Sequence, residues 1–406
     1  MPSHSPLEVL RVFLKLGLIS FGGPIAHIGY FREEFVVRRR WLEEPAFTDL
    51  VALCQFLPGP ASSQVGFSIG LMRSGYLGGM AAWTGFTLPS AIVMVLFAYG
   101  TLAYGTLAYG AGAAGAAMLP GLLHGLTLVA VAIVAQAVWG MARTLCPDRQ
   151  RASIAVAAAL IVLLSKSPLS QIATILFGAI AGFWLCRAPA IASDGAMCVP
   201  VSRRAGIVSL VIFSLLLIGL PALRGLGIQD AAPFAAFYRS GALVFGGGHV
   251  VLPLLRDAFV TPCWVNDDAF LAGYGAAQAV PGPLFSFAAY LGAVASPSPH
   301  GTAGAALGLV AIFLPGMLLL TGALPFWAAL RASAGAQAGM RGVNAAVVGI
   351  LGGALYNPLW TAAVKTRADF CVALIGFILL VKWCVPPLLI VVAGALAGLA
   401  LAQLHQ

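Results

Sequence analysis

One motif occurs twice in this chain, and it limits how the rest of the sequence can be arranged. Residues 13–60 contain F-G-G-P and end in P-G-P, and residues 237–283 contain F-G-G-G-H and end again in P-G-P. With one residue of slippage in a loop, the matching pairs are Gly17 and Gly241, Phe21 and Phe245, Gly22 and Gly246, Gly23 and Gly247, Arg32 and Arg256, Phe35 and Phe259, Trp41 and Trp264, Phe47 and Phe270, and Gln55 and Gln278. A separation of roughly 220 residues indicates two copies of one large unit rather than a short solenoid period.

The composition places both copies in a membrane. Hydrophobic residues make up 60% of the chain and charged residues only 9%, whereas a soluble domain carries about 25% charged residues. Apolar runs of about 20 residues recur along most of the length, which predicts an all-α polytopic membrane protein. The period-two alternation of a transmembrane barrel is absent. The net charge of +9 sits in short loops, where it sets orientation and does not indicate a nucleic-acid partner.

Neither a cofactor nor a metal site is expected. The seven cysteines are scattered without C-x-x-C spacing, so they predict small buried hydrophobes rather than disulfides or metal ligands. The sequence contains no H-E-x-x-H, no phosphate-binding P-loop and no nucleophile elbow. We therefore expect no enzyme activity, and any pumping should draw on an ion gradient.

Two segments of each copy are too irregular to be simple spans. Residues 7–30 carry Glu8, Arg11 and Lys15 and are interrupted by Gly22-Gly23-Pro24, and residues 46–72 are interrupted by Pro58-Gly59-Pro60. A charge at mid-membrane depth costs about 2.5–3.5 kcal/mol on insertion scales, and proline removes a backbone donor. We predict broken or re-entrant hairpins, with equivalent breaks at 246–248 and 281–283.

The remaining hydrophobic runs predict about six membrane segments in each copy. Three parts are expected: a first repeat at residues 1–186, a basic linker with one extra transmembrane helix at 187–232, and a second repeat at 233–406. The predicted clean spans are 76–99, 121–141, 152–165, 168–186, 205–222, 301–322, 343–362, 369–381 and 386–403.

Loop charges predict that the two repeats are inverted. The loop at 32–40 is rich in arginine, whereas its counterpart adds Asp257, Asp267 and Asp268 to Arg256. The later loops reverse this bias, because 101–120 is uncharged and 326–342 carries two arginines. Positive residues stay cytoplasmic, and one extra span between two even-numbered sets turns the second repeat over. Lys365 and Arg367 do not fit this scheme.

Inverted repeats with broken helices are typical of secondary transporters, whose site lies near the midplane. Helix starts at a break expose unpaired N–H groups and a partial positive charge, which bind anions. The candidate substrate-binding residues are Gly22, Gly23, Pro58, Gly59, Pro60, Ser62, Ser63, Gly246, Gly247, Gly248, Pro281, Gly282, Pro283 and Ser286. The alternative is that glycine and proline only permit kinks and close packing, but their presence in both copies favours binding.

Other side chains near the breaks have two interpretations each. Gln55 and Gln278 either donate to an oxyanion or satisfy carbonyls freed by the break. Arg32 and Arg256 either attract anions as gating or coupling residues, with Glu33 and Asp257, or pair with those two neighbouring acids, which we slightly favour.

Two histidines are further candidates. His249, directly after the second glycine run, is a candidate for proton transfer or substrate contact, although hydrogen bonding alone also explains it. His124, within a span, is a weaker candidate.

These motifs resemble the chromate ion transporter family in its long two-repeat form. The resemblance is carried by F-G-G-P at 21–24, F-G-G-G-H at 245–249 and the two P-G-P motifs, together with Trp41 and Trp264. It implies a multi-pass protein of the bacterial inner membrane that exports chromate, driven by the membrane potential or a proton gradient. Copy one has Pro24-Ile25 where copy two has Gly248-His249, so the halves need not contribute equally.

The expected partners are chromate and the lipid bilayer, and two further candidates are sulfate, as a competing tetrahedral dianion, and a second copy of the chain in a homodimer. The alternatives are a carrier for sulfate or another oxyanion, an anion channel whose pore is lined by the breaks, and an intramembrane enzyme. The last lacks a convincing set of reacting residues.

Overall fold

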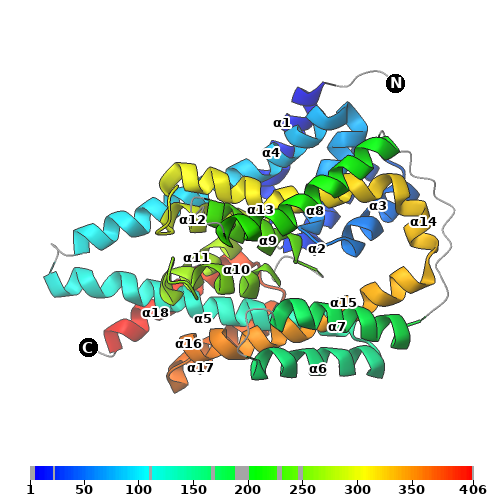
Figure 1. The fold of residues 1–406 in the computed structure, drawn as a ribbon. Helices are drawn as coiled ribbons and strands as arrows, with labels where there is room; N and C mark the ends of the chain where they lie inside the picture. The colour runs from blue at the N-terminus through cyan, green and yellow to red at the C-terminus, as the bar shows by residue number, and fades with distance from the viewer. Residues whose placement is uncertain are drawn as a thin grey trace.

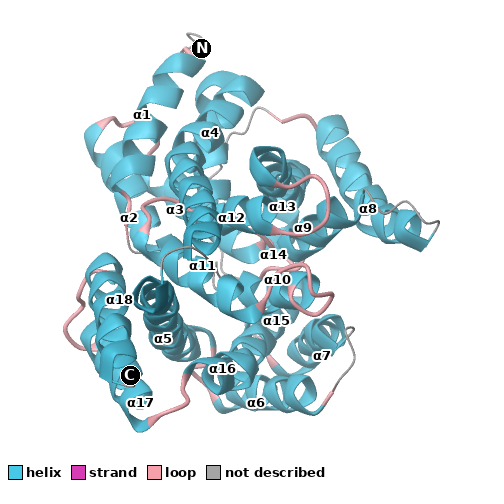
Figure 2. Ribbon diagram, turned by 90° about the vertical axis from the view of Figure 1, so that its left-hand side faces the viewer, coloured by secondary structure: helices cyan, strands magenta, loops and turns pink. Residues whose placement is uncertain are grey.

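The computed structural model describes residues 5–21, 23–108, 112–165, 170–187, 201–225, 231–245 and 250–404. Gly22, Gly246, Gly247, Gly248 and His249, all named above as candidates, lie outside the described residues. Within the described ranges the chain is helical and contains no strand, as predicted for an all-α protein (Figures 1 and 2).

The first half contains α1 (Pro6–Ile19), α2 (Gly23–Arg32), a π-helical turn η1 (Glu33–Arg38), α3 (Glu44–Phe56), α4 (Ala61–Ala108), α5 (Gly112–Leu145), α6 (Arg149–Leu164) and α7 (Ser170–Leu185). The helix α8 (Arg203–Gly225) connects the halves. The second half contains α9 (Ala232–Ala242), α10 (Val251–Phe259), α11 (Asp267–Ala279), η4 (Leu284–Ser286), α12 (Phe287–Val294), α13 (Gly301–Ala323), η5 (Leu324–Phe326), α14 (Trp327–Ala332), α15 (Ala334–Ala354), η6 (Leu355–Trp360), α16 (Thr361–Ala363), α17 (Arg367–Val381) and α18 (Pro387–Leu404).

Several of these helices are long and apolar enough to cross a membrane. Five qualify among the residues that the structure describes: Ala61–Ala103, Gly121–Leu145, Arg203–Pro221, Gly301–Leu330 and Ala334–Ala363. Shorter apolar helices cover Ser170–Leu185, Leu284–Val294 and Pro387–Ala402. The expectation of a multi-pass helical membrane protein is thus confirmed.

The predicted breaks at the P-G-P motifs lie between helices. Proline and glycine separate α3 from α4 and α11 from the short turn η4. At the first F-G-G motif α1 ends at Ile19 and α2 begins at Gly23, whereas the break predicted at 246–248 lies outside the described residues. The backbone of Leu57, directly after α3, is extended, with φ −83° and ψ 149°. Proline at 58 and 60 disfavours continuation of α3, because each lacks a backbone donor.

The helix α4 consists of two arms. Ser74 and Gly75 have non-helical dihedral angles, and a Cβ added at Gly70 would collide with the carbonyl of Gly78. Eight residues of straight helix span about 12 Å, so this contact requires the chain to fold back. The arms, 61–73 and 76–108, match the predicted segments that end at 72 and begin at 76.

The first two helices also form a hairpin. Phe35 stacks on Phe13 with ring centroids 5.0 Å apart, and the equivalent pair, Phe259 and Phe237, is 4.4 Å apart. Ion pairs from Glu8 to Arg39 (3.7 Å) and Arg73 (3.9 Å) join the start of α1, the chain after α2 and the end of the first arm of α4. The chain at Ser20 and Phe21 therefore lies at the tip of a hairpin whose two ends lie together.

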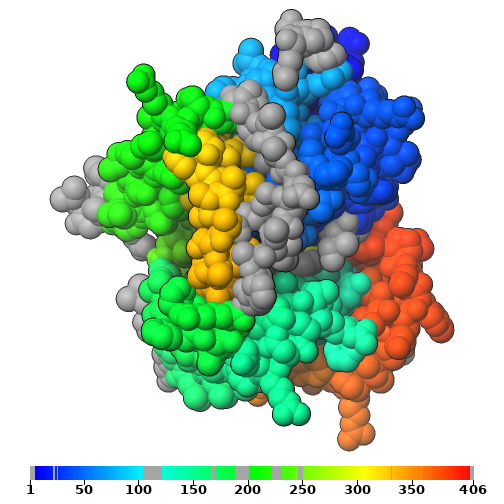
Figure 3. Space-filling view, turned by 90° about the vertical axis from the view of Figure 1, so that its right-hand side faces the viewer, coloured from blue at the N-terminus to red at the C-terminus, as the bar shows by residue number. Residues whose placement is uncertain are grey.

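The two halves are interleaved. The pair α6 and α7 packs on α15 of the second half, and α17 and α18 pack on α5 of the first (Figure 2). Small residues permit these approaches: Gly178 and Gly182 lie against Gly342, and Gly398 lies against Gly125. Figure 3 shows blue, green, yellow-orange and red segments on one face, so parts that are far apart in the sequence share this face.

Candidate anion site

Each P-G-P loop is hydrogen-bonded to the opposite half of the chain. The Gly59 N–H donates to the carbonyl of Val244 at 2.7 Å, and the Gly282 N–H donates to the carbonyl of Ser20 at 2.9 Å. Val244 and Ser20 are equivalent, because each precedes the phenylalanine of an F-G-G motif. The tips of the broken segments from both halves therefore meet.

Both loops need glycine for two reasons. The φ angles are +123° at Gly59 and +102° at Gly282, where other residues are strained. The space is also filled: a Cβ at Gly59 would lie 3.1 Å from the Cα of Gly316, and one at Gly282 would lie 3.0 Å from the Oγ of Ser90. These amides were expected to contact an anion, but in this structure they donate to carbonyls of the opposite half. The amides of these two glycines are therefore already hydrogen-bonded in this structure.

Buried polar side chains of the first half lie near both P-G-P loops: Ser62, Ser63 and Gln64 follow the first loop, and Ser90 lies against Gly282 of the second. Each is at most 4% exposed, and we call them the first-repeat polar cluster: Ser20, His27, Ser62, Ser63, Gln64, Ser68, Thr87 and Ser90. Most buried polar atoms in proteins have a partner. Here five buried oxygens have none in the described part of the chain: Ser20 Oγ, Ser63 Oγ, Gln64 Oε1, Ser68 Oγ and Thr87 Oγ1. The cluster thus holds unused hydrogen-bonding capacity at the meeting point of the two halves.

His27 is central to this cluster. Its Nε2 lies 3.1 Å from the carbonyl of Ser20, and its Nδ1 lies 3.3 Å from the hydroxyl of Ser62. Its ring meets Phe86 edge-on at 5.2 Å. Sequence reasoning missed His27 and singled out His249 instead. The available signal was its position, one helical turn beyond Gly23 on the helix that follows the first break.

Gln64 closes the first loop and contacts the second half. Its Nε2 donates to the carbonyls of Pro58 and Gly316, both at 3.0 Å. The two glutamines predicted from the sequence differ from each other. Gln55 is exposed on α3, whereas Gln278 is partly buried beside Tyr274, and its Nε2 has no partner in the described part of the chain.

The corresponding positions of the second half are apolar. Phe285 and Phe287 stand where the first half has Ser62 and Gln64, and Val251 stands where it has His27. Ser286, the equivalent of Ser63, is retained and is 1% exposed. The polar lining at the meeting point therefore comes mainly from the first half.

The arginines at the loops have other partners than expected. Arg32 pairs with Glu44 at 2.7 Å, and Arg256 pairs with Asp267 at 2.8 and 2.6 Å. The interpretation that each pairs with its sequence neighbour, Glu33 or Asp257, is wrong. After each loop, the chain places an acid at the start of the next helix against the arginine. Glu44 and Asp267 are themselves equivalent, so the same ion pair occurs in both halves.

A buried acid in the first loop was not predicted. Glu34 accepts hydrogen bonds from Arg38 at 3.1 Å and Arg39 at 2.5 Å. Burial alone would raise the pKa of Glu34, but the two guanidinium groups outweigh it and hold this pKa below its ordinary value. The hydrogen bonds of Glu34 with Arg38 and Arg39, together with the cation–π contacts of Arg39 and Arg73 on Trp41, hold the loop in place.

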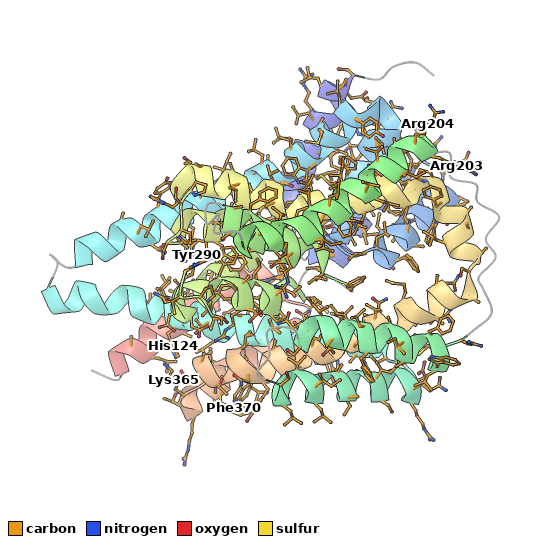
Figure 4. All side chains as sticks on the ribbon, in the orientation of Figure 1. His124, Arg203, Arg204, Tyr290, Lys365 and Phe370 are labelled. Atoms are coloured by element: carbon orange, nitrogen blue, oxygen red, sulfur yellow. The ribbon has the colours of Figure 1, made fainter. Side chains whose placement is uncertain are left out.

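A second contact between the halves lies away from the breaks. His124 of α5 pairs with Asp369 of α17 at 2.8 Å, and Asp369 also caps α17 by accepting from the backbone of Lys365 and Thr366. A cavity of about 270 Å³ adjoins this pair, and Figure 4 shows His124 and Lys365 at the same end of the molecule. In the described residues no group of three potential ligands could hold a metal ion.

Several helices that are long and apolar enough to cross a membrane define a multi-pass helical membrane protein. The chain belongs to the chromate transporter family, whose model matches residues 7–183 and 231–399. Named relatives include the chromate transport protein of Pseudomonas aeruginosa, 29% identical over 86% of this chain and 80% of its own length. The probable chromate transport protein of Synechococcus elongatus is 26% identical over 98% and 96%. The chromate transport protein of Cupriavidus metallidurans is 24% identical over 100% and 96%. No solved structure matches the chain.

Proposed function

We propose that this chain is a secondary transporter of the bacterial inner membrane that exports chromate, driven by the membrane potential or the proton gradient. The observation that carries the proposal is the first-repeat polar cluster, in which hydroxyl and amide groups without partners meet at the tips of both halves. Hydroxyl groups can donate to the oxygens of a tetrahedral anion. Membership of the chromate transporter family and the names of the relatives support chromate as the substrate.

The binding site is formed by the breaks of both repeats, with most polar contacts from the first. Ser62, Ser63 and the start of α4 supply donors, while Gly59 and Gly282 hold the two tips together. In the resting structure the cluster is buried, which supports an occluded state. Export then requires that the two tips separate, so that the cluster opens first toward one face of the membrane and then toward the other.

We further propose that the repeats are inverted and that the broken segments re-enter the membrane. In the first half, the turn at 74–75 lies beside Glu8 and Arg39. Tyr99 lies about 36 Å further along the second arm of α4 by helical rise, and its hydroxyl accepts from the N–H of Thr302 at 3.1 Å. The equivalent turn of the second half lies near the far end of the second arm of α4, which supports the inversion.

The test is chromate flux in proteoliposomes that contain the purified full-length protein. Saturable flux that follows an imposed membrane potential or pH gradient supports a carrier. Flux that does not saturate would indicate a channel, and sulfate flux without chromate flux would assign the other carrier function. Empty liposomes and a Gly282→Leu variant serve as controls.

A further inference from the structure

The first-repeat polar cluster must compensate a dianion without a permanent cation. Its described members are serine, threonine, glutamine and histidine. An unpaired charge in a low-dielectric interior costs tens of kcal/mol by simple Born reasoning, and each helix terminus offsets only up to about 2 kcal/mol. Among these side chains only His27 can gain a positive charge near neutral pH.

We propose that His27 takes up a proton when a tetrahedral oxyanion binds beside Ser20, Ser62 and Ser63, so that anion binding is coupled to protonation. This inference rests on the proposed function, whose site it deepens. It assigns the charge compensation to one side chain of the first repeat.

The hydrogen bonds of His27 make this coupling direct. Because a carbonyl can only accept, Nε2 carries hydrogen toward Ser20. In the neutral ring Nδ1 is then an acceptor, and the Ser62 hydroxyl donates to it across 3.3 Å. A proton added to Nδ1 reverses that bond, and Ser62 becomes the acceptor. The Ser62 hydrogen is thereby released to donate to an anion, so protonation supplies both a positive charge and a new donor.

Other charges do not already perform this role. In the described part of the chain, the Ser62 hydroxyl and the Phe86 ring contact the His27 side chain. The charged side chains of the elements packed against α2 are paired with one another or exposed. Arg32 is paired with Glu44, Glu34 with Arg38 and Arg39, and Arg73 with Glu8, while Arg11, Lys15 and Glu33 are exposed. The tyrosines of α2 and α4 whose side chains are described, Tyr30, Tyr76 and Tyr99, are at least 39% exposed.

The comparison of the halves supports the assignment. Val251 occupies the position of His27 in the second half, and Phe285 occupies that of Ser62. The relay of carbonyl, imidazole and hydroxyl therefore exists once in the described chain. A chain with one relay should bind one oxyanion with one proton.

Calorimetry of sulfate binding to the purified full-length protein tests the coupling. Sulfate is the probe because it remains a dianion from about pH 5.5 to about pH 8.5, the range in which histidine titrates. Titrations in two buffers of different ionisation enthalpy give the number of protons taken up. The variants are His27→Gln, which keeps a polar side chain but cannot titrate, and His300→Gln, a matched control on an exposed loop.

We expect the wild-type protein and His300→Gln to take up close to one proton, with sulfate affinity falling about tenfold per pH unit where uptake is complete. The His27→Gln variant should bind weakly and without pH dependence. Ser62→Ala should keep proton uptake but lose affinity, which distinguishes the relay from a general effect on folding.

Sulfate binding to the wild-type protein without proton uptake would overturn the inference, even if His27→Gln failed to fold. So would a His27→Gln variant that keeps the wild-type pH slope. Chromate flux in proteoliposomes is measured separately. Its absence would overturn the proposed function, whereas chromate flux without proton-coupled binding overturns only the role of His27.

Discussion

The amide of Gly59 donates to the carbonyl of Val244 at 2.7 Å, and this bond joins the first P-G-P loop to the second F-G-G motif. Its counterpart from Gly282 to Ser20 makes the same connection in the opposite direction. The two motifs that repeat in the sequence are therefore partners across the halves. Glycine is needed at both loops because the backbone angles and the neighbouring chain exclude a side chain.

Replacing these glycines should remove transport while the protein still inserts. Gly59→Leu and Gly282→Leu place a side chain where the opposite half already lies, and the backbone strain alone costs about 1–3 kcal/mol. We expect loss of chromate flux in proteoliposomes at unchanged membrane expression. Gly100→Leu, at a helical position with open space, is the control. Normal chromate flux in both loop variants would show that the two loops are not part of the transport site.

Labelling of single cysteines should place the loops of the two repeats on opposite faces. On the inverted topology, residues 32–44 and 331–341 are protected in intact cells, and 260–268 are accessible, because the arginine-rich loops stay inside. The measurement is reaction with a membrane-impermeant maleimide before and after permeabilisation. Equal accessibility of 32–44 and 260–268 would contradict the inversion.

Sulfate should compete with chromate. The cluster offers hydroxyl donors, which can bind any tetrahedral dianion, and it has no fixed cation that would select one of them. We expect chromate flux to fall as external sulfate rises. Gln55→Ala and Gln278→Ala should weaken both anions alike, and we expect a smaller effect at Gln55, which is exposed. Chromate flux that is unaffected by a large sulfate excess would show that another feature sets selectivity.

The pair of His124 and Asp369 should contribute mainly to stability. Asp369 is 3% exposed and caps α17 while it binds His124, so Asp369→Ala removes a cap and leaves a buried partner unpaired. We expect a loss of about 1–3 kcal/mol, measured as a lower thermal midpoint in detergent. Asp268→Ala, in the first turn of α11, provides the comparison. An unchanged midpoint would mean that the contact is not formed.

Acid should weaken the first loop through Glu34. The pKa of this carboxyl is lower in the folded protein than its ordinary value of 4.5, so its stabilising effect is present above that value and is lost as the pH falls through the folded pKa. We expect the difference in thermal midpoint between wild type and Glu34→Gln to shrink below about pH 4. A difference that is constant with pH would argue against the ion pair.

Much of the fold follows from local sequence signals. Prolines at 58, 60, 281 and 283 lack a backbone donor, and each pair encloses a glycine, which together disfavour continuation of a helix, so these breaks could be predicted. The partners across the chain could not, because Glu44 reaches Arg32 only after a loop whose path the sequence does not specify. His27 was missed for a similar reason: its hydrogen bonds to Ser20 and Ser62 arise from two hairpin tips that meet only in the folded chain.

The exchange of loops between the halves also bears on how such a chain could arise. The P-G-P glycine of each half donates its N–H to a carbonyl of the other half, as in two subunits of an antiparallel homodimer. On the inverted topology, α8 is the tether that converts such a dimer into one polypeptide. A half-length chain with this motif would need to insert in both orientations and could complete its site only with a partner. Fusion removes that requirement and allows the two copies to differ, as they do at Val251, Phe285 and Phe287, which stand opposite His27, Ser62 and Gln64.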